Sequence, residues 1–335
     1  MLPKLRGVGG PSSFQAKLKL RLKQVGIQTH HNIYEPGTKS LLVIGGTRQI
    51  GALIYAKRNR VRIVQRLDGM NWLHKKHATG FRHNLRSERN NLQLSLIRRY
   101  FADAIVYQSN FTREWWNTVY GVQNKPSTVI HNGVDLNTFS PGDIPSINTK
   151  SIRMLVIEGS FRGGHVRDLK NAVGIANGIA EKSHQSVDLL IAGIVPEKFK
   201  AMINVHENAT VHWLGLVQHE KIPVLNRSAH LFYPAEINAA CPNALIEAMA
   251  CGVPIIGYAT GSLPELVGQD GGAIVPYNGD FWNLEPPDSE PLVDAAINIL
   301  GSQAQFRQSA RQRAEKLFSV ESMVEKYRRI LLDDL

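Results

Sequence analysis

The segment from Leu231 to Val267 constrains the fold more than any other part of the sequence, because two apolar runs in it enclose one helix. Residues 231–234 form the first run, and a helical spacing of apolar residues starts after Asn243 and stops at Gly252. The second run, residues 253–258, leads through Gly261 into 263–265, Leu-Pro-Glu, a typical helix start. Strand, helix, strand and helix in this order predict an α/β fold with a parallel sheet.

Both helix starts follow the ends of buried strands, so we expect them to lie at one crevice of the sheet. Each helix N-terminus carries about half a positive charge and free N–H donors, which suits a pyrophosphate. Gly261 permits close approach of another backbone. The residues predicted to bind the diphosphate are Cys241, Pro242, Asn243 and Ala244 at the first helix start, and Gly261 and Ser262 at the second.

Two motifs in this segment, residues 247–254 (Glu-Ala-Met-Ala-Cys-Gly-Val-Pro) and 261–265 (Gly-Ser-Leu-Pro-Glu), resemble the donor-binding signature of retaining GT-B glycosyltransferases of group 1, or family 4. The resemblance implies two doubly wound, Rossmann-like parallel-sheet domains that face a central cleft. It also implies that Glu247 binds the donor ribose, although a glutamate here could also simply favour the helix N-terminus. The family's first glutamate stands eight residues earlier, where this chain has Ala239, and the nearest acid is Glu236.

Further donor contacts follow from the same resemblance. A glycine loop at residues 7–10 opens a helix, and Gly9 and Gly10 are expected to approach the reacting phosphate and the acceptor. Only a few residues precede this loop, so the first strand is very short or the true start lies upstream. Gly215 and Leu216, which follow a later strand, are expected to contact the nucleotide base through backbone groups.

Two loops supply the basic and acidic residues that are candidates for contact with the donor diphosphate and the donor sugar. The family places an arginine, and about five residues later a lysine, on the donor diphosphate; here Arg162 and Arg167 have that spacing. An alternative register puts Ser160 at the arginine position and leaves Lys170 as a substitute. After the strand at residues 61–66, Arg66 and Asp68 are candidates for contact with the donor sugar. Asp68 could instead only hold its own turn.

The domain division is expected near residue 145. Residues 141–151 carry Pro, Gly, Ser and Asn without apolar periodicity, which is typical of a linker. We therefore predict an acceptor-side domain at 1–145 and a donor-binding domain at 146–318, and the resemblance implies that a helix at about 319–335 packs back on the first. The turn at Asn132-Gly133 offers residues tolerant of positive φ, and we interpret it as a structural turn at the cleft rim, with a direct ligand role as the alternative.

Charge divides the chain unevenly. Residues 1–145 hold 22 Lys or Arg and 7 Asp or Glu, net +15, whereas residues 146–335 hold 17 and 21, net −4. Arg82, Arg86 and Arg89 share one face of a predicted helix at 81–100. This pattern indicates attraction to an anionic membrane surface or an anionic acceptor, with a solvated helix flank as the alternative. Nothing resembles a nucleic-acid-binding motif.

Other features of the sequence indicate where the protein is located and whether it needs a metal or a cofactor. No apolar run reaches the ~20 residues of a membrane span, and no signal peptide is indicated, so we expect a cytoplasmic protein, or one peripheral at the inner membrane face. Cys241 and Cys251 are expected to be reduced packing residues. We find no zinc-like Cys/His spacing and no Asp-x-Asp motif, so neither a metal nor another cofactor is predicted.

Taken together, these motifs predict glycosyl transfer. The donor is a nucleotide-diphosphate sugar, and the acceptor is a glycan, a lipid-linked molecule or a small molecule. The resemblance implies retention of anomeric configuration without a metal. Two alternatives stay open: a nucleotide-sugar epimerase, and a catalytically impaired nucleotide-sugar-binding protein that acts as a binding module or complex partner.

Overall fold

The structure is a computed structural model that describes residues 1–4, 10–76, 80–142, 150–161 and 165–332. The chain divides into two compact units: unit 1 comprises Met1–Gly133 and Val320–Leu335, and unit 2 comprises Val134–Ser319. The division therefore lies before the expected linker, since Val134 and Phe139 already belong to the core of unit 2. Each unit is described by itself.

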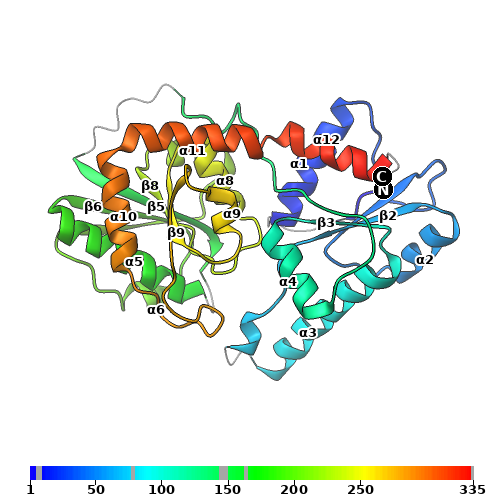
Figure 1. Cartoon of the computed structure of the whole chain (residues 1–335), viewed down its shortest axis with the longest axis horizontal. Helices are drawn as coiled ribbons and strands as arrows, with labels where there is room; N and C mark the ends of the chain where they lie inside the picture. Colours follow the sequence, from blue (N-terminus) through cyan, green and yellow to red (C-terminus); the bar gives the residue numbers. More distant parts are fainter. Residues whose placement is uncertain (5–9, 77–79, 143–149, 162–164, 333–335) are drawn as a thin grey trace. The chain divides into compact units, whose positions relative to one another are not determined.

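Unit 1 is built on a four-stranded parallel sheet in the order β1-β2-β3-β4 (Figure 1). The backbone N–H of Leu42 also donates to the carbonyl of Met1, so the first residues lie beside β1. The strands are β1 (Ser40–Ile44), β2 (Arg62–Leu67), β3 (Ala104–Tyr107) and β4 (Ser127–Val129). The helices are α1 (Gly10–Gln24), α2 (Ile50–Arg58), η1 (Leu73–Lys75), α3 (Phe81–Leu96), the π-helical η2 (Ile97–Phe101), α4 (Asn110–Tyr120) and α12 (Val320–Leu332).

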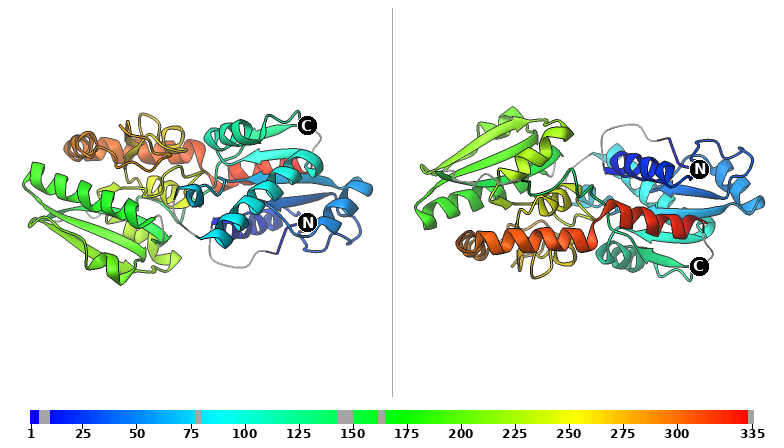
Figure 2. Two further views of the ribbon diagram at one scale, coloured as in Figure 1. Left: turned by 90° about the horizontal axis from the view of Figure 1, so that it is seen from below. Right: turned by 90° about the horizontal axis from the view of Figure 1, so that it is seen from above.

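Helices cover both faces of this sheet, because successive residues of each strand point to opposite sides. On one face, Leu42 and Val64 pack with Phe14 and Leu18 of α1 and with Tyr327 of α12. Both views in Figure 2 show α12 beside α1. On the other face, β1 and β2 pack with α2, and β3 packs with α4. Residues 320–332 thus complete the core of unit 1.

Unit 2 is built on a six-stranded parallel sheet in the order β10-β9-β8-β5-β6-β7. The strands are β5 (Ser151–Ser160), β6 (Ser186–Ile194), β7 (Ala209–Gly215), β8 (Leu231–Phe232), β9 (Ile255–Tyr258) and β10 (Gly272–Val275). The helices are α5 (His165–Ser183), α6 (Glu197–Lys200), η3 (His219–Lys221), α7 (Ile222–Arg227), α8 (Asn243–Ala250), α9 (Leu263–Val267), α10 (Glu290–Gly301) and α11 (Gln303–Leu317).

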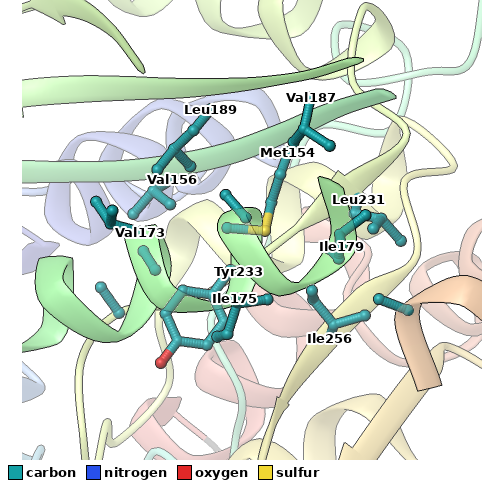
Figure 3. Packing of buried hydrophobic residues seen from close by; sticks show 14 of the residues in the cluster. Met154, Val156, Val173, Ile175, Ile179, Val187, Leu189, Leu231, Tyr233 and Ile256 are labelled. Carbon is teal, nitrogen blue, oxygen red and sulfur yellow. The ribbon is translucent and has the colours of Figure 1, made fainter. Parts of the chain in front are cut away.

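The core of unit 2 also lies on both faces of its sheet. Figure 3 shows Met154 of β5 and Leu189 of β6 gathered with Val173 and Ile179 of α5, on the face that α10 also covers. The alternate strand residues, such as Leu155, pack with α8, α9 and α11 on the opposite face. Two parallel-sheet α/β units are therefore confirmed, and each has helices on both faces of its sheet. None of the helices in the described ranges combines the length and apolar character needed to cross a bilayer.

The turn at Asn132-Gly133 is structural for a different reason from the one expected. Neither residue has a positive φ. A Cβ atom on Gly133 would instead lie 2.7 Å from Cα of Val320, and its carbonyl accepts a hydrogen bond from Lys17 Nζ at 3.0 Å. The glycine is needed because the start of α12 touches the turn, and no side chain fits between them.

Candidate functional site

The predicted donor residues of unit 2 follow the carboxyl ends of parallel strands. From β5 the chain crosses to β6 and β7 on one side, and it then returns to β8, β9 and β10 on the other. Strand order therefore reverses between β5 and β8. A crevice forms at such a reversal because the connections that leave the two strands turn away from each other, and ligands of open α/β sheets bind there. The starts of α5 and α8 flank this point.

The start of α8 presents backbone donors next to a buried carboxylate. Pro242 caps the helix in an extended conformation, and the first helical bond runs from the N–H of Ile246 to the Pro242 carbonyl at 3.4 Å. The N–H groups of residues 243–245 precede that bond. Pro242, Asn243 and Ala244 are half-buried, whereas Cys241 is buried. This helix start can therefore accept an anion from solvent.

Glu247 lies on the first turns of α8 and is only 6% exposed. Its Oε1 lies 3.5 Å from Nε2 of His219, a largely exposed side chain in η3. The His219 ring in turn packs edge-on against Phe139, with ring centroids 5.5 Å apart. The carboxylate is thus held at the edge of the core, where it can accept hydrogen bonds from a ligand's hydroxyl groups.

Gly261 and Ser262 pack against the loop that leads to α8. Gly261 has φ +57°, and a Cβ atom there would lie 2.7 Å from Cα of Asn238 and from the backbone nitrogen of Ala239. Close backbone approach at Gly261 is confirmed, and its partner is this loop. The N–H of Ser262 donates to the Ala239 carbonyl at 3.0 Å, so this backbone donor is occupied. The buried Ser262 hydroxyl has no hydrogen-bond partner within the described ranges.

The predicted basic residues meet different environments. Arg162 lies outside the described residues. Arg167, in the first turn of α5, lies beside the phenol of Tyr277, and its Nη2 is buried without a hydrogen-bond partner in the described part of the chain. Burial raises the pKa of Tyr277, and the Arg167 charge opposes that shift. Lys170 is exposed one turn further along α5. Arg167 is therefore the better placed of the two to hold an anion at the β5 end.

The predicted glycines at residues 215 and 10 lie where the backbone is accessible to a ligand. Gly215 ends β7 with φ +64°, and no heavy atom would lie within 4 Å of a Cβ there. Leu216 next to it is 68% exposed. In unit 1, Gly10 is exposed and begins α1, and Gly9 lies outside the described residues.

Asp68 belongs to unit 1, just after β2. The carboxyl is half-buried, and burial raises its pKa, while the charge of Arg66 opposes the shift. The backbone carbonyl of Asp68 accepts from Trp116 Nε1–H at 2.8 Å, which fixes the turn. Arg66 is buried: its Nη2 donates to Asn132 Oδ1 at 2.8 Å, and its guanidinium lies 4.1 Å from the centre of the Phe14 ring. Arg66 therefore belongs to the core of unit 1, whereas Asp68 lies at the end of β2 with its backbone held by Trp116.

Comparison with known families agrees with this geometry. Residues 161–317, most of unit 2, match the family model "Glycosyl transferases group 1", and residues 44–138 match "Glycosyltransferase Family 4". The matches support a group 1 glycosyltransferase. The epimerase alternative finds no such support.

Among curated glycosyltransferase relatives is the phosphatidylinositol N-acetylglucosaminyltransferase GPI3 subunit of Saccharomyces cerevisiae (strain YJM789), 26% identical over 231 residues, or 64% of this chain and 47% of that protein. Another is the N-acetyl-alpha-D-glucosaminyl L-malate synthase of Bacillus anthracis, 25% identical over 225 residues, or 63% of this chain and 55% of that protein. The chain spans about half the length of the curated relatives it matches.

Solved glycosyltransferase structures share the fold. WaaG, a glycosyltransferase involved in lipopolysaccharide biosynthesis, superposes with a TM-score of 0.69 at 15% identity, covering 100% of both chains. Anabaena Alr3699/HepE, solved in complex with UDP, gives a TM-score of 0.67 at 16% identity, covering 98% of both chains. At these identities the likeness shows the GT-B fold alone.

Two residues beside the candidate site could not be predicted from the sequence. His219 contacts Glu247 only through the tertiary fold, and no local pattern marks it. Asn238 is 3% exposed, has φ +59°, and both amide atoms lack hydrogen-bond partners among the described residues. An asparagine within a loop of small residues was its only signal, because asparagine tolerates positive φ. Cys241 and Cys251 are buried and form no disulfide, and burial raises the pKa of Cys251 to about 12.

Proposed function

We propose that this chain transfers a sugar from a nucleotide-diphosphate donor to an acceptor, with retention of anomeric configuration and without a metal. The observation that carries the proposal is the buried Glu247 carboxylate on the first turns of α8, at the point where strand order reverses. A carboxylate there can accept hydrogen bonds from the ribose hydroxyls, while the helix N-terminus binds the adjacent phosphates.

The protein's main task in this reaction is electrostatic. The bond between the donor's anomeric carbon and the phosphate oxygen breaks, and the acceptor oxygen bonds to that carbon. The acceptor's proton passes to the leaving diphosphate, so atoms and charge balance. Negative charge grows on the diphosphate during this step. The start of α8 and the side chains of Arg167 and Lys170 supply positive charge to stabilise it.

The donor probe follows from the relatives. The names of both curated relatives specify an N-acetylglucosaminyl group, and the Alr3699/HepE structure holds UDP. UDP-N-acetylglucosamine is therefore the donor to test first, within a panel of nucleotide sugars screened by thermal shift. The acceptor is expected to carry a hydroxyl nucleophile.

A second function, nucleotide-sugar binding without turnover, is favoured by one observation. The position of the family's first glutamate holds Ala239, which is 1% exposed and offers no carboxylate. Glu236, three residues earlier, is half-buried. If Glu236 does not replace the carboxylate that Ala239 lacks, we expect the protein to bind the donor without transferring its sugar. Assays of donor binding and of donor hydrolysis or transfer on the same sample separate the two functions.

Replacement of Glu247 tests the proposed donor site. Glu247→Gln keeps the side-chain volume and removes the charge, so we expect affinity for UDP, measured by titration calorimetry, to fall by roughly 10- to 100-fold, the value of one or two charged hydrogen bonds. The thermal unfolding midpoint should change little. Exposed Glu220, in η3, provides the matched control Glu220→Gln. Unchanged UDP affinity in Glu247→Gln would remove Glu247 from the site.

The proposed partner on the acceptor side is an anionic membrane surface, bound through α3. This helix buries polar Ser87 and Asn91 and exposes apolar side chains, an inversion of the usual pattern. The exposed residues recur at helical spacing on one face: Phe81, Leu85, Leu92 and Leu96. Exposed Arg82, Arg86 and Arg89 flank this apolar stripe. A helix with such a stripe beside cationic side chains suits the interface of a membrane that carries anionic lipids.

A further inference from the structure

A histidine borders Glu247, the residue proposed to bind the donor ribose, on the solvent side. Nε2 of His219 lies 3.5 Å from Oε1 of Glu247. The imidazole side chain is 57% exposed, whereas the side chain that carries the carboxylate is 8% exposed. Because the exposed ring borders the buried carboxylate, a ribose that binds Glu247 from solvent lies next to His219.

The His219 ring is held in place by the core of unit 2. It packs against the Phe139 ring, with centroids 5.5 Å apart and planes inclined at 64°. Phe139 is buried, its N–H donates to the Asp135 carbonyl at 2.9 Å, and its carbonyl accepts from Arg311 Nη1 at 2.8 Å. His219 also begins η3, so its backbone belongs to a helical turn. A ring supported in this way can hold the carboxylate that it contacts.

Glu247 needs such support because its side chain has a competing partner nearby. Side chains of a helix lean toward the helix N-terminus, where backbone N–H groups attract a carboxylate. A glutamate can accept from the N–H three residues earlier, as in a capping box, and for Glu247 that residue is Ala244. This N–H is one of the proposed phosphate donors. The contact with His219 favours a carboxylate position beside η3 and leaves the first turn of α8 to the diphosphate.

A second histidine–carboxylate pair in unit 2 has a different environment. Nε2 of His212 lies 3.0 Å from Oδ1 of Asp188. The other oxygen of Asp188 accepts from the Ser151 hydroxyl at 2.5 Å and lies 3.8 Å from Nε of Arg153. Both oxygens of Asp188 therefore join β6 to the neighbouring strands β5 and β7. This pair supports the sheet, and it provides a matched control for His219.

We propose that His219 is a positioning residue for the donor ribose and acts through Glu247. It holds the carboxylate where both vicinal hydroxyls of the ribose, the 2′-OH and the 3′-OH, can donate to it. This inference rests on the proposed function, because it assigns a role to a neighbour of the same site. A nucleotide without the 2′-OH loses one hydrogen bond to a charged group, so the site distinguishes ribonucleotides from 2′-deoxyribonucleotides.

Titration calorimetry of UDP and of 2′-deoxy-UDP against the whole chain tests this role. We expect the parent to bind UDP more tightly by roughly 10- to 100-fold, the value of one hydrogen bond to a charged group. His219→Ala should weaken UDP binding and bring the ratio of the two affinities close to one, while the affinity for 2′-deoxy-UDP changes little. His219→Gln keeps an N–H donor near the position of Nε2 and should restore most of the ratio.

His212→Ala is the matched control and should leave both affinities unchanged. The unfolding midpoint of His219→Ala should stay near that of the parent, because the ring is largely exposed. The inference alone is overturned if Glu247→Gln weakens UDP binding but His219→Ala keeps the ratio of the parent, or if His219→Gln loses the ratio as fully as His219→Ala. Failure of the proposed function gives another result, in which the parent does not bind UDP or Glu247→Gln binds it like the parent, and the inference then fails with it.

Discussion

Gly261 shows at the scale of a single residue how the proposed donor site depends on backbone contact. Its φ of +57° and the 2.7 Å that would separate a Cβ atom from the backbone of Asn238 and Ala239 leave no room for a side chain. We expect Gly261→Ala to lower the free energy of unfolding by about 1–3 kcal/mol, the usual cost of overpacking, and to displace the loop before α8.

Gly174 is the matched control for this change. It lies inside α5, where a Cβ atom would meet no other heavy atom within 4 Å, so Gly174→Ala should stabilise the chain by about 0.5–1 kcal/mol, measured by urea unfolding. Equal effects of the two substitutions would contradict the role given to the Gly261 contact.

Asp68 carries the second prediction at this scale. Since burial raises its pKa, the folded state holds the proton more tightly than the unfolded state, and ionisation costs stability as pH rises above the carboxyl's ordinary pKa of about 4. Asp68→Asn should therefore be more stable than the parent at neutral pH, with a gain that vanishes as pH falls toward 4. Unfolding midpoints across pH 4–8 measure it, and a pH-independent difference would contradict the assignment.

Among the elements, α3 makes the most direct prediction. Leu85→Gln combined with Leu92→Gln removes two exposed leucines from the apolar stripe. Because burying one leucine stabilises binding by about 1.5 kcal/mol or more, removal of two should lower the partition coefficient on vesicles with anionic lipid by about 100-fold. Binding should also weaken as salt concentration rises, since Arg82, Arg86 and Arg89 act through screened charge.

Val224 supplies the control, because it is 62% exposed on α7 of unit 2 and lies outside the stripe. Val224→Gln should leave vesicle binding unchanged. If the double leucine variant co-sediments with anionic vesicles as well as the parent does, α3 is not the contact surface.

Helices with local signals were predictable from sequence, and contacts between distant segments were not. The helix α8 runs from Asn243 to Ala250, and Gly252 follows it with φ +73°, as the apolar spacing and the glycine indicated. The need for Gly133 could not be predicted in the same way, because the Val320 backbone that excludes a side chain lies far along the chain. The exposure of the apolar stripe of α3 could not be predicted either, since the spacing of residues alone does not tell which face of a helix is buried.

For the whole molecule, the fold class was predictable because strand and helix patterns alternate along most of the sequence. The division into units was not, since Val134 and Phe139 join the second core through packing rather than through composition. The candidate site was predictable where it is contiguous, at residues 241–247 and 261–262. His219 and Asn238 belong to neither of these motifs, and only the tertiary fold brings them to the candidate site.

The account's central claim is that the carboxyl edge of the unit 2 sheet binds a nucleotide diphosphate. Hydrogen–deuterium exchange with and without saturating UDP tests it on the intact chain. We predict slower exchange in residues 238–247 and in the first turn of α5, because these segments flank the point where strand order reverses. Residues 215–219 should also exchange more slowly, because His219 contacts Glu247. Absence of protection there, or protection confined to other segments while UDP binds, would contradict the account.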